Sequence, residues 1–349
     1  MRLTACTDRA TTIACMESSR ARRDRRARPP RRRPLLHGAL ATVVVCGTAA
    51  GTAYVNTAAR PGVRAVSSAA TSSPSASISA AAGGEASVEP VAEPTVNHDA
   101  LLADAMKTVH VEDGAAVSVA VLDLDSGASA VYGDGGFDTA SIVKVDILAA
   151  LLLQAQDAGR ELTAAERSYA VDMIEYSDNT AASALWRTIG QAQGLDSANG
   201  RLGLTDTAGG NDMYWGLTQT TAADQLALLR QVFGAADSEL SANSRAYLTE
   251  LMGQVAADQR WGVSAVADGS AWALKNGWLP RTATGLWDIN SIGRVTADGN
   301  GYLVAVLSDG NSTKQQGVAM VEAATRAAVS VFTAGGASTA PGAMTPAAS

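Results

Sequence analysis

Three short stretches of this 349-residue chain hold residue types that could together perform acyl-transfer chemistry. They are Ser141-Ile-Val-Lys144, Ser177-Asp178-Asn179 and Lys275-Asn276-Gly277. In chain order they supply a nucleophilic hydroxyl, an amine base, a bridging hydroxyl, an amide that can hold a substrate, and a late cation. No single stretch is specific, but together they predict a serine nucleophile that is activated by lysine instead of histidine.

The scarcity of two residue types supports this prediction. The histidines are His37, His98 and His110. No imidazole follows residue 110, so a Ser-His-Asp triad within the later part of the chain is excluded. The lysines are Lys107, Lys144, Lys275 and Lys314. Two of these four lie in the three stretches.

The spacing of Ser141 and Lys144 suits a nucleophile and its base. Residues three apart at the start of a helix share one face, and a helix N-terminus favours negative charge. A lysine acts as a base only if burial and a nearby cation, here Lys275, lower its pKa toward neutrality. Most lysines are solvated, but residues 145–153 are almost wholly apolar and indicate that Lys144 is buried. Ser177 could then relay a proton, and Asn179 could bind a substrate amide.

The N-terminal region predicts export from the cytoplasm. Residues 1–34 are rich in Arg, and residues 1–64 contain 13 Arg against three acidic residues. Residues 35–55 carry no charged side chain and are long enough to cross a membrane. The basic flank would hold its own end in the cytoplasm. We expect the domain to lie outside the cytoplasm, anchored by this helix or secreted after cleavage. Met16 is an alternative start to Met1, because both features follow it.

Composition divides the remainder into a linker, one domain and a tail. Residues 56–97 and 334–349 are rich in Ala, Ser, Pro and Gly, which predicts disorder. A single domain is expected at 98–333. Beyond residue 64 the chain has 31 acidic and 14 basic residues, which argues against a nucleic-acid partner. The cysteines are Cys6, Cys15 and Cys46. Disulfides and cysteine metal sites are therefore excluded from the domain, and we expect no metal and no cofactor.

Periodicity and turn signals predict an α+β domain. Helices are expected over 100–109, 141–158, 164–174, 180–189, 222–233, 241–256 and 316–332. Strands are expected over 116–123, 128–132, 272–275, 286–292 and 301–308. Thr139 or Ser141 is expected to cap the second helix. Since strands come from both ends of the domain, we predict a three-layer α/β/α fold, with a mainly antiparallel sheet and an inserted all-helical lobe.

The motif set resembles that of the penicillin-recognising serine hydrolases, and more closely a class A β-lactamase domain. The likeness spans roughly residues 98–333. It includes the segments TASIVKVDILAALL, EYSDNTAASAL, QTTAADQLALL and ALKNGW in the family's order. The fold predicted from the element order is the fold that this resemblance implies.

The resemblance also implies a role for each motif residue. Ser141 would be acylated, with Lys144 and Ser177 as its proton network. Lys275 would steer the substrate carboxylate, and the backbone N–H groups of Ser141 and Trp278 would form an oxyanion hole. The expected substrate-binding residues are Asn179, Asn276, Gly277, Trp278 and Arg281.

Two departures concern the carboxylate contact and the length of the helical lobe. The family usually has Thr or Ser where this chain has Asn276, whose amide can still bond a carboxylate. Arg281 could supply a bidentate carboxylate contact, although a solvated loop arginine explains it equally well. The stretch between Ser141 and Ser177 is shorter than in typical members, so we expect a trimmed helical lobe.

A third departure concerns release of the acyl group. The family's deacylating glutamate belongs in the loop before Thr220, but no Glu occurs between residues 175 and 239. Asp206 and Asp212 are the carboxylates of that loop, and both are interpreted as turn residues. Slow hydrolysis of the acyl-enzyme is therefore expected. Of the tryptophans in the domain, Trp278 is expected at the cleft and most of the others, Trp215 among them, in the core.

Three functional interpretations remain open. The first is a β-lactam-acylating serine hydrolase outside the cytoplasm. The second, favoured by the missing glutamate, is a D,D-peptidase or esterase acting on D-Ala-D-Ala-like ends. The third is a non-catalytic module that binds cell-wall peptide or drug. Retention of both Ser141 and Lys144 argues against the third, since a binding module needs no nucleophile and base. We expect a monomer whose partners are a small-molecule substrate and the membrane.

Overall fold

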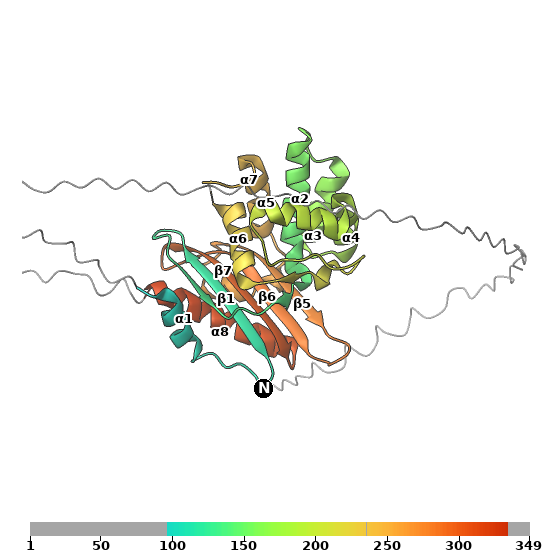
Figure 1. Cartoon of the computed structure of the whole chain (residues 1–349). Coiled ribbons are helices and arrows are strands. Elements are labelled where there is room, and N and C mark those ends of the chain that lie inside the picture. Colours follow the sequence, from blue (N-terminus) through green and yellow to red (C-terminus); the bar gives the residue numbers. More distant parts are fainter. Residues whose placement is uncertain (1–95, 235, 334–349) are drawn as a thin grey trace, which may run out of the picture. The chain divides into compact units, whose positions relative to one another are not determined.

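The computed structural model describes residues 96–234 and 236–333 (Figure 1). The strands are β1 (Ala116–Asp123), β2 (Ser129–Tyr132), β3 (Phe137–Asp138), β4 (Gln219–Thr220), β5 (Trp272–Pro280), β6 (Trp287–Ala297) and β7 (Asn300–Asn311). The helices are α1 (His98–Met106), α2 (Val143–Asp157), α3 (Ala164–Glu175), α4 (Asn179–Ile189), α5 (Gln191–Leu202), α6 (Ala222–Phe233), α7 (Ala242–Gly253) and α8 (Lys314–Thr333). Four 3-10 turns complete the order: η1 (Ala140–Ile142), η2 (Trp215–Leu217), η3 (Ala257–Gln259) and η4 (Gly262–Val266).

Four predicted segments lie outside the described residues: the Arg-rich segment, the membrane segment, almost all of the linker, and the tail. Among residues 96–333, no helix combines the length and the apolar character that crossing a membrane requires.

The main sheet joins strands from both ends of the domain, as predicted. Its order is β2-β1-β7-β6-β5, and every neighbouring pair is antiparallel. The β1–β2 hairpin turns at Gly127, whose φ of 73° suits glycine. Strand β5 forms one edge of the sheet. The predicted α+β class, with a mainly antiparallel sheet and an inserted helical lobe, is confirmed.

Both faces of the sheet are buried, because alternate side chains on each strand point to opposite sides. On β7, Tyr302, Val304 and Val306 belong to a core shared with α1 and α8. The intervening Leu303 and Ala305 belong to a second core shared with the inserted helices. Figure 1 shows α1 and α8 on one side of the sheet and the helical lobe on the other.

Helix α2 is the centre of the helical lobe. Its sequence is apolar almost all round, which is typical of a helix that is enclosed on every side. All its residues except Gln154, Gln156 and Asp157 are buried, and it contacts α3, α4, α5 and α7. A helix enclosed in this way holds its first turn, which carries Lys144, in a fixed position.

The turn between α3 and α4 is fixed by hydrogen bonds of its own residues. Asp178 is the N-cap of α4, and its side chain accepts from the Ala181 N–H at 2.7 Å. Ser177 immediately before it has a φ of 56°. A non-glycine residue in this left-handed region is uncommon and strained. The turn therefore places the Ser177 side chain in a direction that regular helix would not allow.

Several predicted local features are wrong. Ser141 lies in η1 rather than in α2, and neither Ser141 nor Thr139 caps a helix with its side chain. Strand β5 continues to Pro280, so the residues after Lys275 are part of the sheet. Helix α5 was not expected, because its sequence contains Gly194 and Gly200 and is mostly polar. Its buried apolar side chains, including Leu195, show that tertiary packing overrides weak helix propensity.

A buried carboxyl group in α2 predicts pH-dependent stability. Asp146 is 1% exposed, and neither of its oxygens has a hydrogen-bond partner among the described residues. Burial, with smaller effects of the Asp196 and Asp224 charges, raises its pKa to about 8, although the Asn199 amide opposes this. The folded state thus keeps a proton that the unfolded chain releases near pH 4. This group's contribution to stability falls as the pH rises from about 4 to about 8.

Asp146→Asn removes this titration. We expect it to raise the free energy of unfolding relative to the native sequence at pH 8, and to have a smaller effect at pH 5. The difference should change by up to about 1.4 kcal/mol per pH unit within that window. Urea unfolding of both proteins at the two pH values measures it. An equal difference at both values would show that Asp146 does not titrate in this range.

Candidate active site

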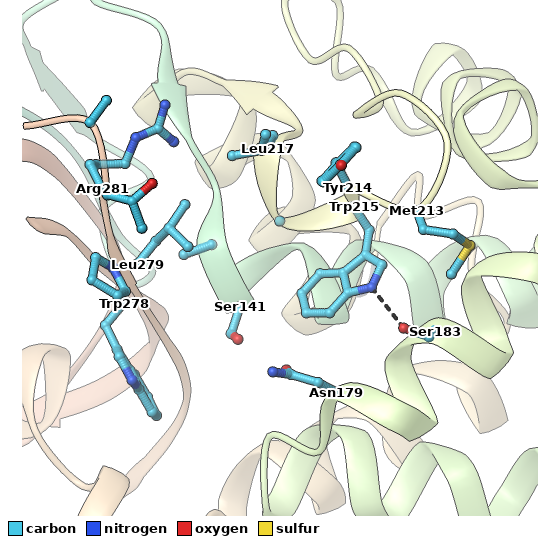
Figure 2. A pocket seen from close by; sticks show the side chains of 15 residues that line it. Ser141, Asn179, Ser183, Met213, Tyr214, Trp215, Leu217, Trp278, Leu279 and Arg281 are labelled. Carbon is cyan, nitrogen blue, oxygen red and sulfur yellow. Dashed lines mark hydrogen bonds between the residues drawn. The ribbon is translucent and has the colours of Figure 1, made fainter.

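Ser141 lies at the base of a cavity of about 580 Å³ between β5 and the loop that carries η2 (Figure 2). It occupies the middle of η1, directly after β3 and before α2. The residue before it, Ala140, has a φ of 48°. Such a conformation persists at a non-glycine residue only when the surroundings impose it, and it is common beside reactive groups.

Lys144 is fully buried, and its ammonium is held by the turn before α4. Its Nζ donates to the Ser177 carbonyl at 2.7 Å, the Ser177 Oγ at 3.0 Å and the Asn179 Oδ1 at 2.9 Å. Burial lowers the pKa of this lysine to about 7, and the Asp178 charge opposes the shift only in part. A large fraction of the amine is therefore neutral near pH 7 and can accept a proton.

The Ser177 hydroxyl connects Lys144 with Lys275. Its Oγ accepts from the Nζ of Lys275 at 3.1 Å, and that Nζ also donates to the Asn276 carbonyl at 3.0 Å. Lys275 is fully buried too, and its pKa is lowered well below the usual value, first by burial and then by the charge of Lys144. One hydroxyl between two amines can carry a proton from one side of the site to the other.

The Ser141 hydroxyl itself makes no hydrogen bond to the residues that the structure describes. Its closest functional neighbour along the chain is Lys144, one turn onward, whose three donors are directed to Ser177 and Asn179. Catalytic hydrogen bonds are often loose without substrate. The structure thus brings Ser141, Lys144, Ser177 and Lys275 to one place without forming the Ser141–Lys144 bond.

Asn179 is oriented by its bond to Lys144. Because its Oδ1 accepts from the lysine, its amide N–H groups are left for the cavity. Figure 2 shows this amide extending toward the side of the cavity where Ser141 lies. Asn179 and Ser141 both line the cavity, so the amide can donate to a carbonyl oxygen beside the nucleophile.

Gly277 allows β5 to approach η1 closely. A Cβ on this glycine would lie 2.7 Å from the Thr139 carbonyl and 2.9 Å from the Ser141 nitrogen. Any side chain would therefore push the strand away from the nucleophile. The expected oxyanion-hole groups, the N–H groups of Ser141 and Trp278, come from the two segments that meet here. Trp278 lines the cavity, with Lys314 Nζ 3.9 Å from the centroid of its ring.

Asn276 and Arg281, both predicted to bind a substrate carboxylate, are bonded to other groups of the protein in this structure. The Asn276 side chain is buried, and its Nδ2 donates to the carbonyls of Gln259 and Trp261 at 2.7 and 3.0 Å. Both of its donors are used. Arg281 borders the cavity, but its guanidinium pairs with Asp138 and lies 3.5 Å from Asp288.

The loop between α5 and β4 contributes an apolar wall without a carboxylate. Met213 through Leu217 line the cavity, whereas Asp206 and Asp212 do not. Trp215 was expected in the core, but its ring faces the site and its centroid lies 5.0 Å from the Lys144 Nζ. Only its place in the loop where the family has its glutamate could have indicated this. No group of three His, Cys, Asp or Glu within residues 96–333 could hold a metal ion.

A family model and several solved structures are similar to parts of the chain. The model described as the β-lactamase enzyme family matches residues 166–332, a range that contains Ser177, Asn179 and Lys275 and begins after Ser141 and Lys144. No curated protein matches.

Three similar structures illustrate the shared fold. PBP-A is 21% identical, with a TM-score of 0.58 over 67% of this chain and 96% of its own. The TLA-1 extended-spectrum β-lactamase is 17% identical, with a TM-score of 0.58 over 68% and 99%. A representative class A β-lactamase from Bacteroides cellulosilyticus is 16% identical, with a TM-score of 0.57 over 69% and 100%. The fold therefore corresponds to nearly the whole of each of these proteins.

The contact between Gly277 and η1 predicts the effect of a single added methyl group. Gly277→Ala should separate β5 from Ser141, with a loss of about 1–3 kcal/mol in stability. Because the oxyanion groups move apart, covalent labelling by a fluorescent penicillin should slow by about a hundredfold.

Gly253→Ala is the matched control, because a Cβ there meets nothing within 4 Å. We expect it to leave both thermal stability and labelling rate nearly unchanged. Equal labelling rates for the two variants would contradict the proposed role of this close approach.

Proposed function

We propose that the described domain is a class A β-lactamase-like serine hydrolase of the penicillin-recognising type, in which Ser141 is acylated by β-lactams or D-Ala-D-Ala-like amides and deacylated slowly; the family model and the similar folds support this proposal. The observation that carries this proposal is the buried Lys144–Ser177–Lys275 connection beside Ser141. A protein that only binds a ligand gains nothing from two buried amines that share a hydroxyl. One similar structure, a PBP-A mutant, was solved as an acyl-enzyme complex with penicillin-G.

Acylation begins with transfer of the Ser141 proton to the neutral amine of Lys144. The serine oxygen then bonds to the amide carbonyl carbon, and the N–H groups of Ser141 and Trp278 stabilise the oxyanion. The proton passes from Lys144 through the Ser177 hydroxyl to the leaving nitrogen. The C–N bond breaks, which leaves an ester on Ser141. Lys275 supplies positive charge on the far side of Ser177, where a substrate carboxylate would bind.

Slow deacylation is supported by the composition of the cavity wall. Among the described residues that line the cavity there is no Asp or Glu. No carboxylate among these residues can therefore act as a general base for the water molecule that attacks the ester. A D,D-peptidase or esterase would use the same residues, and the absence of this carboxylate is the observation that favours it.

The proposed place of action is outside the cytoplasm. The Arg-rich residues 1–34 and the uncharged residues 35–55 support this proposal. The domain would then meet either cell-wall peptides or β-lactams without crossing the membrane.

Intact-protein mass spectrometry after exposure to penicillin tests the proposed function. We expect one covalent adduct of the full drug mass, persisting for minutes or longer, and no adduct in Ser141→Ala. The same spectrum gives the mature N-terminus. Lys144→Met should slow acylation by at least about a hundredfold. Ser183→Ala keeps this proton network and should still form the adduct. No adduct in the native protein would exclude covalent chemistry and favour a binding module.

The lowered pKa of Lys144 predicts the pH dependence of acylation. The base must be unprotonated, so the acylation rate should rise with pH through about 7 and level off above it. Below about pH 6 the rate should fall roughly tenfold per pH unit. Stopped-flow acylation by a chromogenic cephalosporin between pH 5 and 9 measures this, with circular dichroism as the check on folding. A rate independent of pH in this range would mean that Lys144 is not the base.

A further inference from the structure

Trp215 lies beside the Lys144 amine on the loop side of the cavity. Its ring centroid lies 5.0 Å from the Lys144 Nζ, within the range of a cation–π interaction. Its indole N–H donates to the Ser183 Oγ on α4 at 3.1 Å. The ring is therefore fixed at both ends, by the cation on α2 and by the hydroxyl on α4. Figure 2 shows it between the Ser141 and Ser183 side chains.

The loop that carries this ring is held close to the nucleophile. The turns η1 and η2, which contain Ser141 and Trp215, contact each other. Next to the tryptophan, Gly216 lies so near η1 that a Cβ there would be 3.8 Å from the Ala140 carbonyl. Ser141 and Trp215 line the same cavity. The indole thus covers the serine–lysine pair from the side on which the loop lies.

We propose that the Trp215 indole shields the acylated Ser141 from water and thereby sets the lifetime of the acyl-enzyme. This inference rests on the proposed function. The missing carboxylate permits slow deacylation, and the inference assigns control of the deacylation rate to one side chain, that of Trp215. The ring has no hydrogen-bond acceptor for a water molecule, and its single donor is used by Ser183. A water that is to attack the ester from this side finds an apolar surface.

The Trp215 ring also affects the protonation state of Lys144. An aromatic face near an ammonium group favours the charged form, and a charged Lys144 cannot accept a proton from water. Both the shielding from water and the cation–π contact therefore slow hydrolysis of the acyl-enzyme. The first step remains possible, because the Ser141 hydroxyl needs no water to reach Lys144 and because burial lowers the Lys144 pKa to about 7, so that part of the amine is neutral.

Removal of the Trp215 ring allows water to hydrolyse the Ser141 ester, with Lys144 as the base. Water enters beside Lys144 and gives a proton to the neutral amine, while its oxygen bonds to the ester carbonyl carbon. The tetrahedral intermediate collapses, and the bond from that carbon to the Ser141 Oγ breaks. The proton returns from Lys144 to the serine oxygen, which frees the acid product and restores the enzyme.

The test compares acyl-enzyme lifetimes in the full-length protein. Trp215→Leu and the native protein are acylated with benzylpenicillin, freed of excess drug, and followed by intact mass over time. We expect the half-life of the adduct to shorten by about tenfold or more in Trp215→Leu, because water then reaches a general base, Lys144. Trp272→Leu is the matched control, because that indole also lies against a cation, Arg260, but outside the cavity. It should keep the native half-life.

Two further variants separate shielding from a structural effect. Ser183→Ala removes only the anchor of the ring and should shorten the half-life by a smaller factor, about two- to fivefold, as expected for one lost hydrogen bond. Trp215→Phe restores an apolar ring and should return most of the lifetime. In Trp215→Leu the deacylation rate should rise with pH through about 7, because Lys144 becomes the base for water.

The outcomes distinguish this inference from the function on which it rests. A native protein that forms no adduct overturns the proposed function. An adduct that forms but decays equally in the native protein, Trp215→Leu and Ser183→Ala overturns the shielding role alone. If Trp215→Leu fails to fold, an unchanged half-life in Ser183→Ala overturns it as well.

Discussion

Two buried lysine amines that share one hydroxyl are the constraint on which the site depends. The Ser177 Oγ accepts from Lys144 at 3.0 Å and from Lys275 at 3.1 Å, and both lysines are fully buried. Two ammonium groups removed from water are costly, by several kcal/mol each. Burial lowers the pKa of both amines, and an amine that loses its proton no longer carries this cost. The same burial that would destabilise a structural lysine lowers the pKa of Lys144 to about 7, which the proposed role as a base requires.

The fold supplies these groups from three segments that are distant in the chain. Lys144 comes from the enclosed helix α2, Ser177 from a capped turn 33 residues later, and Lys275 from the edge strand β5, 98 residues after Ser177. Each segment belongs to a different part of the two cores. The cavity therefore exists only where the helical lobe and the sheet meet, and no shorter fragment could form it.

Two of the six described non-glycine residues with positive φ lie at the candidate site. Ala140, immediately before the nucleophile, and Ser177 both have positive φ, at 48° and 56°. Conformations of this kind cost about 1–3 kcal/mol each and persist where packing imposes them. Here the imposing elements are β5, which approaches η1 at Gly277, and the Asp178 cap of α4. The loop wall adds a further feature, because the residues by which it lines the cavity include no carboxylate.

The sequence by itself determined the element order and the fold class, and it indicated the chemistry that we propose. Period-two and helical patterns are local, so strands such as β1 and helices such as α6 could be predicted to the residue, and motif order indicated Ser141, Lys144, Ser177 and Lys275. Helix α5 could not be predicted, since its stability comes from packing and not from propensity. Tertiary structure alone decided that Asn276 and Arg281 bond within the protein and that the Trp215 ring lies beside the Lys144 amine. These outcomes depend on which backbone carbonyls, carboxylates and cations lie nearby in space. The local sequence does not indicate these neighbours, because they come from distant parts of the chain.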